Sequence, residues 1–239
     1  MSGTVAIIGA TGGIGAALAR RVAARGARPF LIGRDGGRVA ALGAELGAAH
    51  AVADALDTAS LAAAVQAAGP ALSGLAYCVG SILLKPLKRT TEADMLDCFR
   101  LNVVGAMVAV QAAAPALAAG QGAVVLFSSV AARSGFPNHV AIGAAKAAVE
   151  GLALSLGAEL APVRVNVIAP SLTRTGIAAP LTGNAQMAEA IAKLHPVPRL
   201  GEAEDSAALA DFLLSDQAGW VSGQVIGVDG GRASLRSKG

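Results

Sequence analysis

Three glycines near the start of the chain have the spacing of a phosphate-binding turn. Gly9, Gly13 and Gly15 follow the apolar run Thr4–Ile8 and open a segment with helical character, Ile14–Arg25. Glycine tolerates positive φ, and its missing side chain lets backbone N–H groups approach a pyrophosphate at the positive end of a helix. Such a triplet is a weak signal alone. Because it follows the first strand directly, it predicts a dinucleotide-binding turn rather than a tight turn without a ligand.

The end of the next apolar run bears on which dinucleotide is bound. Pro29–Ile32 is followed by Gly33, Arg34 and Asp35, and the last two lie 19 and 20 residues past Gly15. A carboxylate at this point would bind a ribose 2′-hydroxyl, and an arginine would pair with a 2′-phosphate. Gly33 leaves room for a phosphate and Arg34 is nearer the strand end. We therefore expect NADP(H), with NAD(H) as the alternative and a solvated surface charge as the interpretation of Arg34 without a ligand.

Short apolar or β-branched runs alternate with longer alanine-rich segments along the chain. We expect strands over Thr4–Ile8, Pro29–Ile32, Ala51–Ala53, Gly74–Cys78, Ala123–Phe127, Val163–Ile168 and Gln224–Val228. We expect helices over Ile14–Arg25, Gly37–Leu46, Thr58–Ala68, Glu92–Ala118, Asn138–Leu160, Ala185–Leu194 and Ala203–Leu214. This alternation predicts right-handed βαβ units. The fold class is therefore α/β: one Rossmann-like domain over residues 1–239, a doubly wound parallel sheet with helices on both faces. In such sheets the ligand lies at the carboxyl ends of the strands.

Composition and charge argue against several other classes of protein. A chain of 239 residues with 54% hydrophobic content can bury one large core. The formal charge of +3 comes from scattered basic residues without aromatic partners, which argues against nucleic acid. Two cysteines, Cys78 and Cys98, are too few for a disulfide framework, and the three histidines are too dispersed for a metal site. With neither a basic leader nor an apolar stretch long enough to span a bilayer, we expect a soluble cytoplasmic protein without membrane contacts.

Two of the expected helices are apolar on nearly all sides. They are Leu101–Ala118 and the helix that follows Asn138. A helix without a polar face is usually buried on two sides, and packing on the sheet accounts for only one of them. We therefore expect a homodimer or homotetramer formed through these helices. The alternative is that alanine is simply abundant in this chain.

From about Thr4 to Arg232 the chain resembles the short-chain dehydrogenase/reductase family. The resembling pieces, in the family's order and with its spacing, are GATGGIG (9–15), VADALD (52–57), AYCVG (76–80), LNVVG (101–105), FSSVA (127–131), AAKAAVEG (144–151), RVNVIAPSLTRT (164–175), RLGEAED (199–205) and GQVIGVDGG (223–231). The resemblance implies hydride transfer between a nicotinamide cofactor and a carbonyl or alcohol. It also implies a small substrate-lid segment at about 172–200.

The resemblance implies a role for each matching position. Asn102 would hold a helix bend and a water, Ser129 would bind the substrate oxygen, and Lys146 would bond the nicotinamide ribose and lower the pKa of a neighbouring tyrosine. Asp54 would contact the adenine, and Val79 and Gly80 its ribose, while Pro170 and Thr175 would border the carboxamide. With Arg34 added, the expected cofactor-binding set is Gly9, Thr11, Gly12, Gly13, Ile14, Gly15, Arg34, Asp54, Ala55, Val79, Gly80, Lys146, Pro170 and Thr175.

The sequence departs from the family pattern at two places. The family's Asn-Asn-Ala-Gly after the fourth strand is replaced by the residues 77–80, Tyr-Cys-Val-Gly, which loses amide hydrogen bonds. The family's catalytic tyrosine precedes the lysine by four positions, and that position is Ile142. Ser129 and Lys146 keep the family's separation of 17 residues, so no gap moves the alignment. The only tyrosine of the chain, Tyr77, belongs to the fourth expected strand.

A histidine lies one helical turn before the changed position. With Asn138 as the expected N-cap, His139, Ile142 and Lys146 fall at i, i+3 and i+7 on one helix face. Imidazole titrates near neutral pH, so we hypothesise that His139, directly or through a water, replaces the tyrosine as proton donor. The alternative is that His139 lines the substrate mouth or bonds the backbone. His195 is a second, weaker candidate, and we expect His50 at the surface.

Three functions remain open at this point. The first is an NADP(H)-dependent oxidoreductase acting on a small molecule, and Ser129 and Asn102 favour it, because a pure binder has little use for a hydroxyl beside the nicotinamide. The second is a nucleotide-binding sensor or scaffold with impaired or no catalysis. The third is non-redox chemistry on the same fold, which the retained glycine loop disfavours.

Overall fold

A seven-stranded parallel sheet forms the centre of the protein. The computed structural model describes residues 3–236, and the sheet has the order β3-β2-β1-β4-β5-β6-β9. All neighbouring strands in it are parallel. This confirms the predicted doubly wound sheet. The strands are β1 (Thr4–Ile8), β2 (Arg28–Gly33), β3 (His50–Val52), β4 (Gly74–Tyr77), β5 (Ala123–Phe127), β6 (Arg164–Pro170) and β9 (Val225–Val228).

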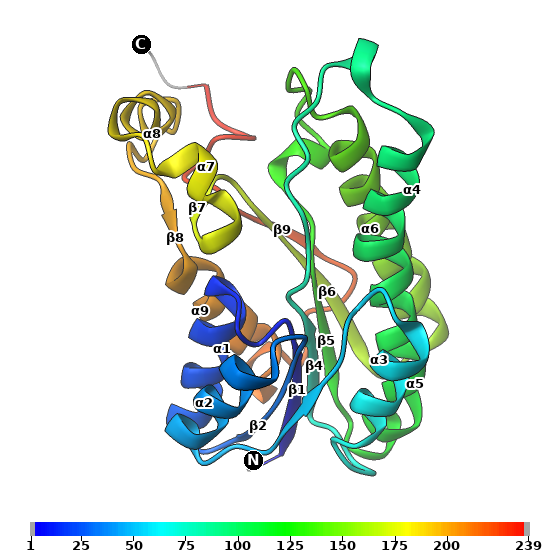
Figure 1. The fold of residues 1–239 in the computed structure, drawn as a ribbon. Coiled ribbons are helices and arrows are strands. Elements are labelled where there is room, and N and C mark those ends of the chain that lie inside the picture. The colour runs from blue at the N-terminus through cyan, green and yellow to red at the C-terminus, as the bar shows by residue number, and fades with distance from the viewer. Residues whose placement is uncertain (1–2, 237–239) are drawn as a thin grey trace.

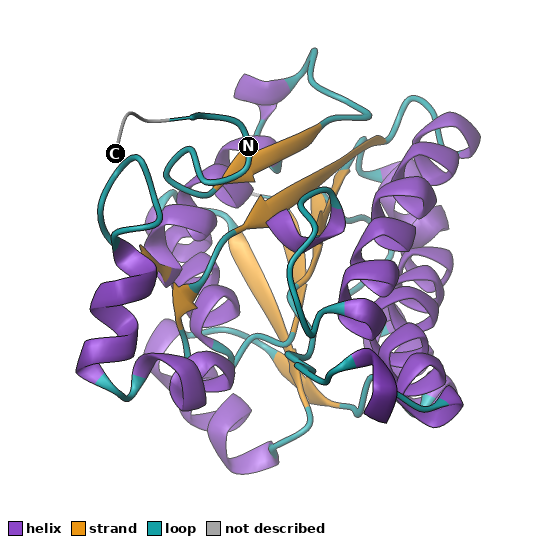
Figure 2. Cartoon of the chain, turned by 90° about the horizontal axis from the view of Figure 1, so that it is seen from above, coloured by secondary structure: helices purple, strands orange, loops and turns teal. Residues whose placement is uncertain are grey.

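Helices cover both faces of the sheet, as Figure 1 shows from the side and Figure 2 from above. One face packs against α1 (Gly13–Ala24), α2 (Gly36–Leu46) and α9 (Ala203–Leu213). The other face packs against α3 (Thr58–Gln66), α5 (Gly105–Ala119) and α6 (Val140–Glu159). The helix α4 (Glu92–Phe99) lies against α6 and leads into α5.

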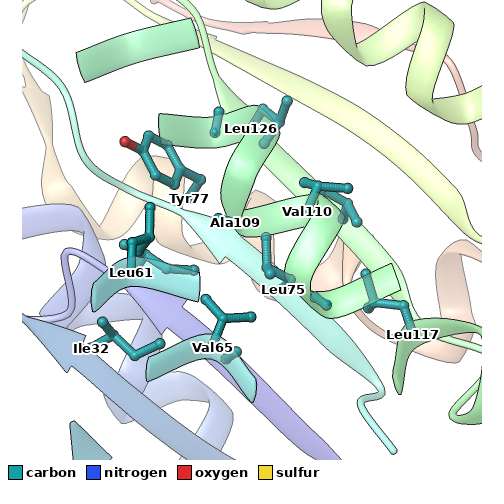
Figure 3. Close-up of a cluster of buried hydrophobic side chains, with 14 of the residues drawn as sticks. Ile32, Leu61, Val65, Leu75, Tyr77, Ala109, Val110, Leu117 and Leu126 are labelled. Atoms are coloured by element: carbon teal, nitrogen blue, oxygen red, sulfur yellow. The ribbon is translucent and has the colours of Figure 1, made fainter. Parts of the chain in front are cut away.

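The central strands send alternate side chains into the two core layers. On β1, Val5 and Ile7 face the α1–α9 layer, whereas Ala6 and Ile8 face the α3–α5 layer. Figure 3 shows the second layer, where Tyr77 of β4 lies among apolar side chains from the sheet, α3 and α5. A parallel strand buried on both faces is a continuous apolar run in the sequence. That is why the strands could be predicted with small errors at their ends.

The direction of the chain connections reverses beside β1. From β1 the chain moves outward to β2 and β3, and it then returns to β4 on the other side of β1. Gly9 follows β1, and the N–H of Cys78 after β4 donates to the Ile8 carbonyl at 2.8 Å. Ligands of doubly wound sheets bind in the crevice at such a reversal, outside the carboxyl ends of the strands. The glycine turn therefore lies at the expected ligand position.

The segment between β6 and α9 forms a small subdomain above the sheet, where the lid was expected (Figure 1). Two short strands, β7 (Thr173–Arg174) and β8 (Gly201–Glu202), pair at its base. Between them lie η4 (Gly176–Ala178), α7 (Ala179–Thr182) and α8 (Ala185–Ala192). The sequence predicted α8 but not β7, β8 or α7. Three other single turns are η1 (Leu87–Arg89), η3 (Val130–Ala132) and η5 (Asp216–Ala218).

The long helix predicted over residues 92–118 is interrupted. A π-helical turn, η2 (Arg100–Val104), separates α4 from α5. Asn102 Nδ2 donates to the Cys98 carbonyl at 2.9 Å, and the Tyr77 hydroxyl donates to the Leu101 carbonyl at 2.6 Å. Side chains that take hydrogen bonds from the backbone ladder are a known cause of helix irregularity, and π-turns often mark functional sites. The resemblance had implied this bend at Asn102, but the helical periodicity alone had not.

Two helical stretches within residues 3–236 are long and apolar enough to cross a membrane by length and composition. They are Glu92–Ala119 and Val140–Glu159, so the expectation that no stretch is apolar enough is wrong on this criterion. Each has one side packed on the sheet, which explains much of its apolar composition. Leu96, Val104 and Leu154 remain exposed on these helices. Their association with a second subunit stays a prediction.

Candidate active site

The glycine turn brings backbone close to where an anion would lie. Gly9 has φ +78°, and its N–H donates to the Ile32 carbonyl at 2.8 Å. A Cβ on Gly15 would overlap the Gly9 carbonyl oxygen, so the helix start packs directly on the turn. No described side chain caps α1, whose N-cap is Gly12 and whose first turn lacks acidic residues. The free N–H groups of this first turn therefore fit a pyrophosphate.

Two arginines and an aspartate follow β2, where the protein would bind the 2′-phosphate or the 2′-hydroxyl of the cofactor's ribose. Arg34 is exposed, and Asp35 is the N-cap of α2, with Oδ1 accepting the Arg38 N–H at 3.0 Å. Arg38 Nη2 donates to the Thr11 carbonyl at 2.6 Å, which places its guanidinium on the glycine turn. The sequence reasoning missed Arg38. Arg38 lies one helical turn after Asp35, and this spacing is the sequence feature from which it could have been predicted.

The end of β3 lies beside the end of β2. The Ala53 N–H donates to the Gly33 carbonyl at 3.1 Å. Asp54 is exposed at this edge, and its Oδ1 accepts the Leu56 N–H at 2.9 Å, whereas Ala55 is buried in the core. Asp54 is therefore accessible to a ligand, while the side chain of Ala55 packs inward.

A cavity of about 390 Å³ opens at the carboxyl ends of β4, β5 and β6. Its lining includes most of the residues expected near the reacting end of the cofactor: Ile14, Val79, Gly80, Ser129, His139, Lys146, Pro170 and Thr175. The other expected residues lie outside this lining, at the glycine turn and the ends of β2 and β3, or behind the wall: Gly9, Thr11, Gly12, Gly13, Gly15, Arg34, Asp54, Ala55 and Asn102. The predicted set thus divides into a phosphate and adenine end and a reacting end. Thr175 joins them, because a Cβ on Gly13 would lie 2.7 Å from its Cγ2.

Lys146 is buried at the inner wall of the cavity. Its side chain is on α6, and Nζ donates to the Phe127 carbonyl at 2.8 Å, its one hydrogen bond to a described residue. Burial lowers the pKa of Lys146 to about 8, against a smaller opposing effect of Cys98. A buried ammonium group needs more than one acceptor. Its two remaining N–H groups are therefore available to a ligand.

Asn102 presents an unsatisfied acceptor at the same wall. Nδ2 donates to the Cys98 carbonyl and lies 3.3 Å from Ser81 Oγ, but the buried Oδ1 has no partner among residues 3–236. A Cβ placed on Gly80 would lie 3.2 Å from this oxygen and 3.1 Å from Lys146 Nζ. A buried acceptor without a partner indicates a ligand or water. Both groups therefore converge where glycine leaves space, which fits the hydroxyl-rich ribose of a nicotinamide cofactor.

Ser129 lines the cavity from the loop after β5. Its Oγ accepts the Ala131 N–H at 3.2 Å, which leaves the hydroxyl proton free to donate. The adjacent Ser128 Oγ lies 2.8 Å from Glu150 Oε1, and Arg133 Nε donates to Glu150 Oε2 at 2.7 Å. The buried Glu150 of α6 therefore holds the loop that carries Ser129. Nothing in the local sequence pattern had singled out Glu150.

An alkyl side chain occupies the cavity wall one helical turn before Lys146. Ile142 is 5% exposed, lines the cavity and packs with Cys98, Ala141 and Ala145. Tyr77 does not replace it, because its ring lies in the core and its hydroxyl is bound to the Leu101 carbonyl. Burial, with a smaller contribution from Asp54, raises the pKa of Tyr77 well above its usual value. The described part of the cavity lining therefore contains no phenol.

His139 lines the cavity from the N-terminus of α6. The N-cap is His139 itself, so the expectation of Asn138 is wrong: Asn138 has φ +68°, and its carbonyl accepts the Lys85 N–H at 2.8 Å. His139 Nδ1 lies 2.7 Å from the Pro137 carbonyl. A carbonyl only accepts, so Nδ1 carries a proton and Nε2 is the nitrogen open to exchange. The structure shows the backbone bond and places His139 in the cavity lining, whereas the substrate mouth and the proton-donor role stay predictions.

The other two histidines lie outside the cavity lining. His195 is buried, with Nε2 2.8 Å from Ser171 Oγ and Nδ1 2.9 Å from the Ile191 carbonyl. These bonds tie the lid to the end of β6 and occupy both ring nitrogens, which removes His195 as a proton donor. His50 is exposed at the start of β3, as expected.

Comparisons with known proteins agree with this arrangement. A family model described as enoyl-(acyl carrier protein) reductase matches residues 9–233. The 2-(S)-hydroxypropyl-CoM dehydrogenase 3 of Xanthobacter autotrophicus is 34% identical over 97% of this chain and 96% of its own length. The protein named inactive 2-(S)-hydroxypropyl-CoM dehydrogenase 2 of the same organism is 36% identical over 91% of this chain and 100% of its own.

A solved structure shows the same fold. The short-chain type dehydrogenase/reductase from Mycobacterium ulcerans superposes with a TM-score of 0.92 at 34% identity, covering 99% of this chain and 91% of that one. The match therefore extends over nearly the whole of both proteins. The chain belongs to the short-chain dehydrogenase/reductase family, a family of oxidoreductases that use nicotinamide cofactors.

Proposed function

We propose that the protein is an NADP(H)-dependent oxidoreductase that transfers a hydride between nicotinamide and a carbonyl or alcohol, with Ile142 in place of the usual tyrosine acid. One observation carries this proposal. The Lys146 ammonium and Asn102 Oδ1, which has no hydrogen-bond partner among the described residues, meet at Gly80, on the wall of the cavity that Ser129 also lines. A hydroxyl beside such a site serves chemistry rather than binding alone.

The residues present fit the cofactor at both ends. The first turn of α1 would hold the pyrophosphate, Lys146 would hold the nicotinamide ribose, and the bound nicotinamide would supply or accept the hydride. Ser129, whose hydroxyl proton is free, would donate a hydrogen bond to the substrate carbonyl and polarise it. Ile142 forms a packed part of this wall but has no proton to give.

The alkoxide that forms from a carbonyl needs a proton from another group. We assign this role to His139, acting directly or through a water. Its support is that His139, Ile142 and Lys146 all line one cavity, and that the Pro137 carbonyl fixes the ring with Nε2 as the exchanging nitrogen.

The choice of NADP(H) is supported by the charges after β2. Arg34 is exposed, and the Arg38 guanidinium lies on the glycine turn. The carboxylate of Asp35, the group that would bind a ribose 2′-hydroxyl, is already engaged as the N-cap of α2. Two cations and an occupied carboxylate favour a 2′-phosphate.

Restoring the phenol tests this function. Wild type is first titrated with NADPH and NADH, and NADPH should bind more tightly. Turnover is then measured on a panel of ketones, quinones and acyl thioesters. Ile142→Tyr should raise kcat in wild type, and by about 100-fold or more in the His139→Gln background, where no other acid is positioned. Ile142→Phe is the control, because it adds the same ring without the hydroxyl and should not raise kcat.

A second function is a nucleotide-binding sensor or scaffold with impaired catalysis. The alkyl side chain at position 142 favours it, and one of the relatives carries the word inactive in its name. Tight NADPH binding without turnover in wild type, Ile142→Tyr and Ile142→Phe alike would establish this second function and overturn the first.

A further inference from the structure

An arginine from the C-terminal segment reaches the same cavity. Arg232 follows β9, and Figure 1 shows this last segment running beside the lid helices α7 and α8. Among the described lining residues, the cationic side chains are Lys146 and Arg232, and none is Asp or Glu. A mostly apolar cavity with cations and no acid attracts an anionic ligand. Lys146 belongs to the cofactor side, so the role of Arg232 is left to explain.

The backbone around Arg232 is held in a defined turn. Asp229 Oδ1 accepts the Gly231 N–H and Oδ2 accepts the Ala233 N–H, both at 2.9 Å. The Arg232 N–H donates to the Asp229 carbonyl at 3.0 Å. Gly230 and Gly231 adopt positive φ, +59° and +83°, which glycine alone accepts at low cost. Hydrogen bonds therefore fix the backbone that carries the Arg232 side chain.

The guanidinium itself is oriented but not neutralised. Nη1 donates to the Leu194 carbonyl at 2.8 Å, and Cζ lies 5.4 Å from the centroid of the Phe136 ring. Arg232 forms no ion pair with a carboxylate in the described part of the chain, and Nε and Nη2 have no hydrogen-bond partner there. A planar guanidinium with two free donors is suited to a two-pronged bond with a carboxylate.

The two cations lie at different ends of the cavity. Lys146 is bonded at the end of β5, whereas Arg232 contacts Phe136, which precedes α6, and Leu194, which follows α8. The seven residue steps from His139 to Lys146 alone span about 10 Å along the helix axis. Apolar side chains line the cavity from the lid, among them Ile177 and Leu181. A ligand that reaches both ends needs an apolar spacer.

We propose that Arg232 binds a carboxylate at the far end of the substrate, and that the substrate class is an oxo acid or hydroxy acid with an apolar chain. The position of the oxo or hydroxyl group beside Ser129 rests on the proposed function. The carboxylate subsite does not, because it requires binding and no turnover. The two can therefore be tested separately.

Calorimetric titration of a matched pair of ligands tests the subsite. Octanoate and octanamide, with butanoate to decanoate as a length series, are titrated into the NADPH-saturated full-length protein. Octanoate should bind wild type at least about tenfold more tightly than octanamide, as expected for one charge-assisted hydrogen-bonded pair. Arg232→Gln should reduce this ratio to within about twofold, and Arg232→Lys should restore part of it.

A neighbouring cation serves as the control. Lys193 also lies at the end of α8 and pairs with Glu189 at 2.8 Å, but it does not line the cavity. Lys193→Gln removes the same charge and should leave the ratio of octanoate to octanamide affinity unchanged. A fall in the ratio in this variant would mean that general electrostatics, not Arg232, selects the acid.

Two results would overturn the proposal. One is equal affinity of wild type for octanoate and octanamide. The other is an equal loss of both affinities in Arg232→Gln, which would show that Arg232 only ties the C-terminal segment to the lid. Turnover of 7-oxooctanoate separates the two inferences: selective octanoate binding without reduction of 7-oxooctanoate would contradict hydride transfer to the oxo group of such an acid and leave the carboxylate subsite standing.

Discussion

The two ends of the predicted ligand site differ in the groups that form them: backbone groups at one end and side chains at the other. The predicted phosphate end consists of backbone: N–H groups of the glycine turn, with Gly15 packed against the Gly9 carbonyl. The reacting end is made of side chains, namely Ser129, His139, Ile142 and Lys146 around one cavity. A backbone site persists when side chains change around it. A site made of side chains can lose one function through a single substitution.

Under the proposed function, this difference explains how the chain could keep a cofactor site with Ile142 in place of the acid. The hydroxyl expected at position 142 would be one polar atom at the end of one side chain. Replacing that side chain by Ile leaves a well-packed wall with Cys98, Ala141 and Ala145 and disturbs no backbone contact. At the glycine turn, by contrast, replacing one side chain removes no binding group. Only a substitution whose added atom displaces the backbone would weaken binding there.

The largest effect is expected where such an atom is added. Gly15→Ala places a Cβ against the Gly9 carbonyl oxygen and 3.0 Å from Ala10 Cα, all of it backbone. The turn must shift, which should weaken NADPH binding by about 100-fold or more and lower the free energy of unfolding by about 2 kcal/mol. Fluorescence titration and urea unfolding measure the two effects.

Gly151→Ala is the matched control. Gly151 lies inside α6, and a Cβ on it would meet no described atom within 4 Å. This substitution should leave NADPH affinity unchanged and raise the free energy of unfolding by up to about 1 kcal/mol, the helix preference of alanine over glycine. Equal NADPH affinity in Gly15→Ala and wild type would show that the turn is not the phosphate site.

The difference between the backbone end and the side-chain end also explains which features could be predicted from the sequence. The backbone end was predictable because glycine spacing and apolar runs report directly on strand, turn and helix. The strands β1 and β5 were predicted to the residue, and the turn over Gly9 to Gly15 follows β1 as predicted. The family resemblance added Asn102, Ser129 and Lys146, and the structure brings Ser129 and Lys146 to one cavity with Asn102 behind its wall.

What the sequence did not show depends on contacts between distant residues. Glu150 holds the Ser129 loop through Ser128 and Arg133, residues 22 and 17 positions away. Arg232 reaches the cavity from beyond the last strand, 38 positions from its partner Leu194. The N-cap at His139 was missed because the positive φ of Asn138 cannot be read from its type. Hydrophobic periodicity predicts one helix or strand at a time, whereas these contacts each connect two or more separate elements.

A smaller effect is expected from the proposed proton donor. His139→Gln removes the imidazole ring but keeps a polar side chain at the N-cap, and it should lower kcat by about 100-fold with NADPH affinity unchanged within about twofold. His50→Gln, at an exposed position on β3, is the control and should not change kcat. Full activity of His139→Gln would leave His139 as a residue of the substrate mouth only.

The smallest expected effect lies at the reacting end, where the burial of Lys146 makes the free energy of unfolding depend on pH. Burial lowers the pKa of Lys146 from 10.5 to about 8, so between these values the unfolded chain binds more protons than the folded protein. The contribution of Lys146 to the free energy of unfolding therefore rises with pH in this range, by about 1 kcal/mol between pH 8 and pH 9. An opposite contribution begins in the same range, because burial raises the pKa of Cys78 from 9.0 to about 12, so this thiol loses its proton first in the unfolded chain. Urea unfolding of cofactor-free wild type and Lys146→Met at pH 8 and pH 9 isolates the Lys146 contribution: the free energy of unfolding of wild type should rise by about 1 kcal/mol relative to that of Lys146→Met. An equal change of the free energy of unfolding with pH in Lys146→Met and wild type would assign the change to another group. It would also contradict the inference that the buried Lys146 ammonium lacks hydrogen-bond acceptors in the cofactor-free protein.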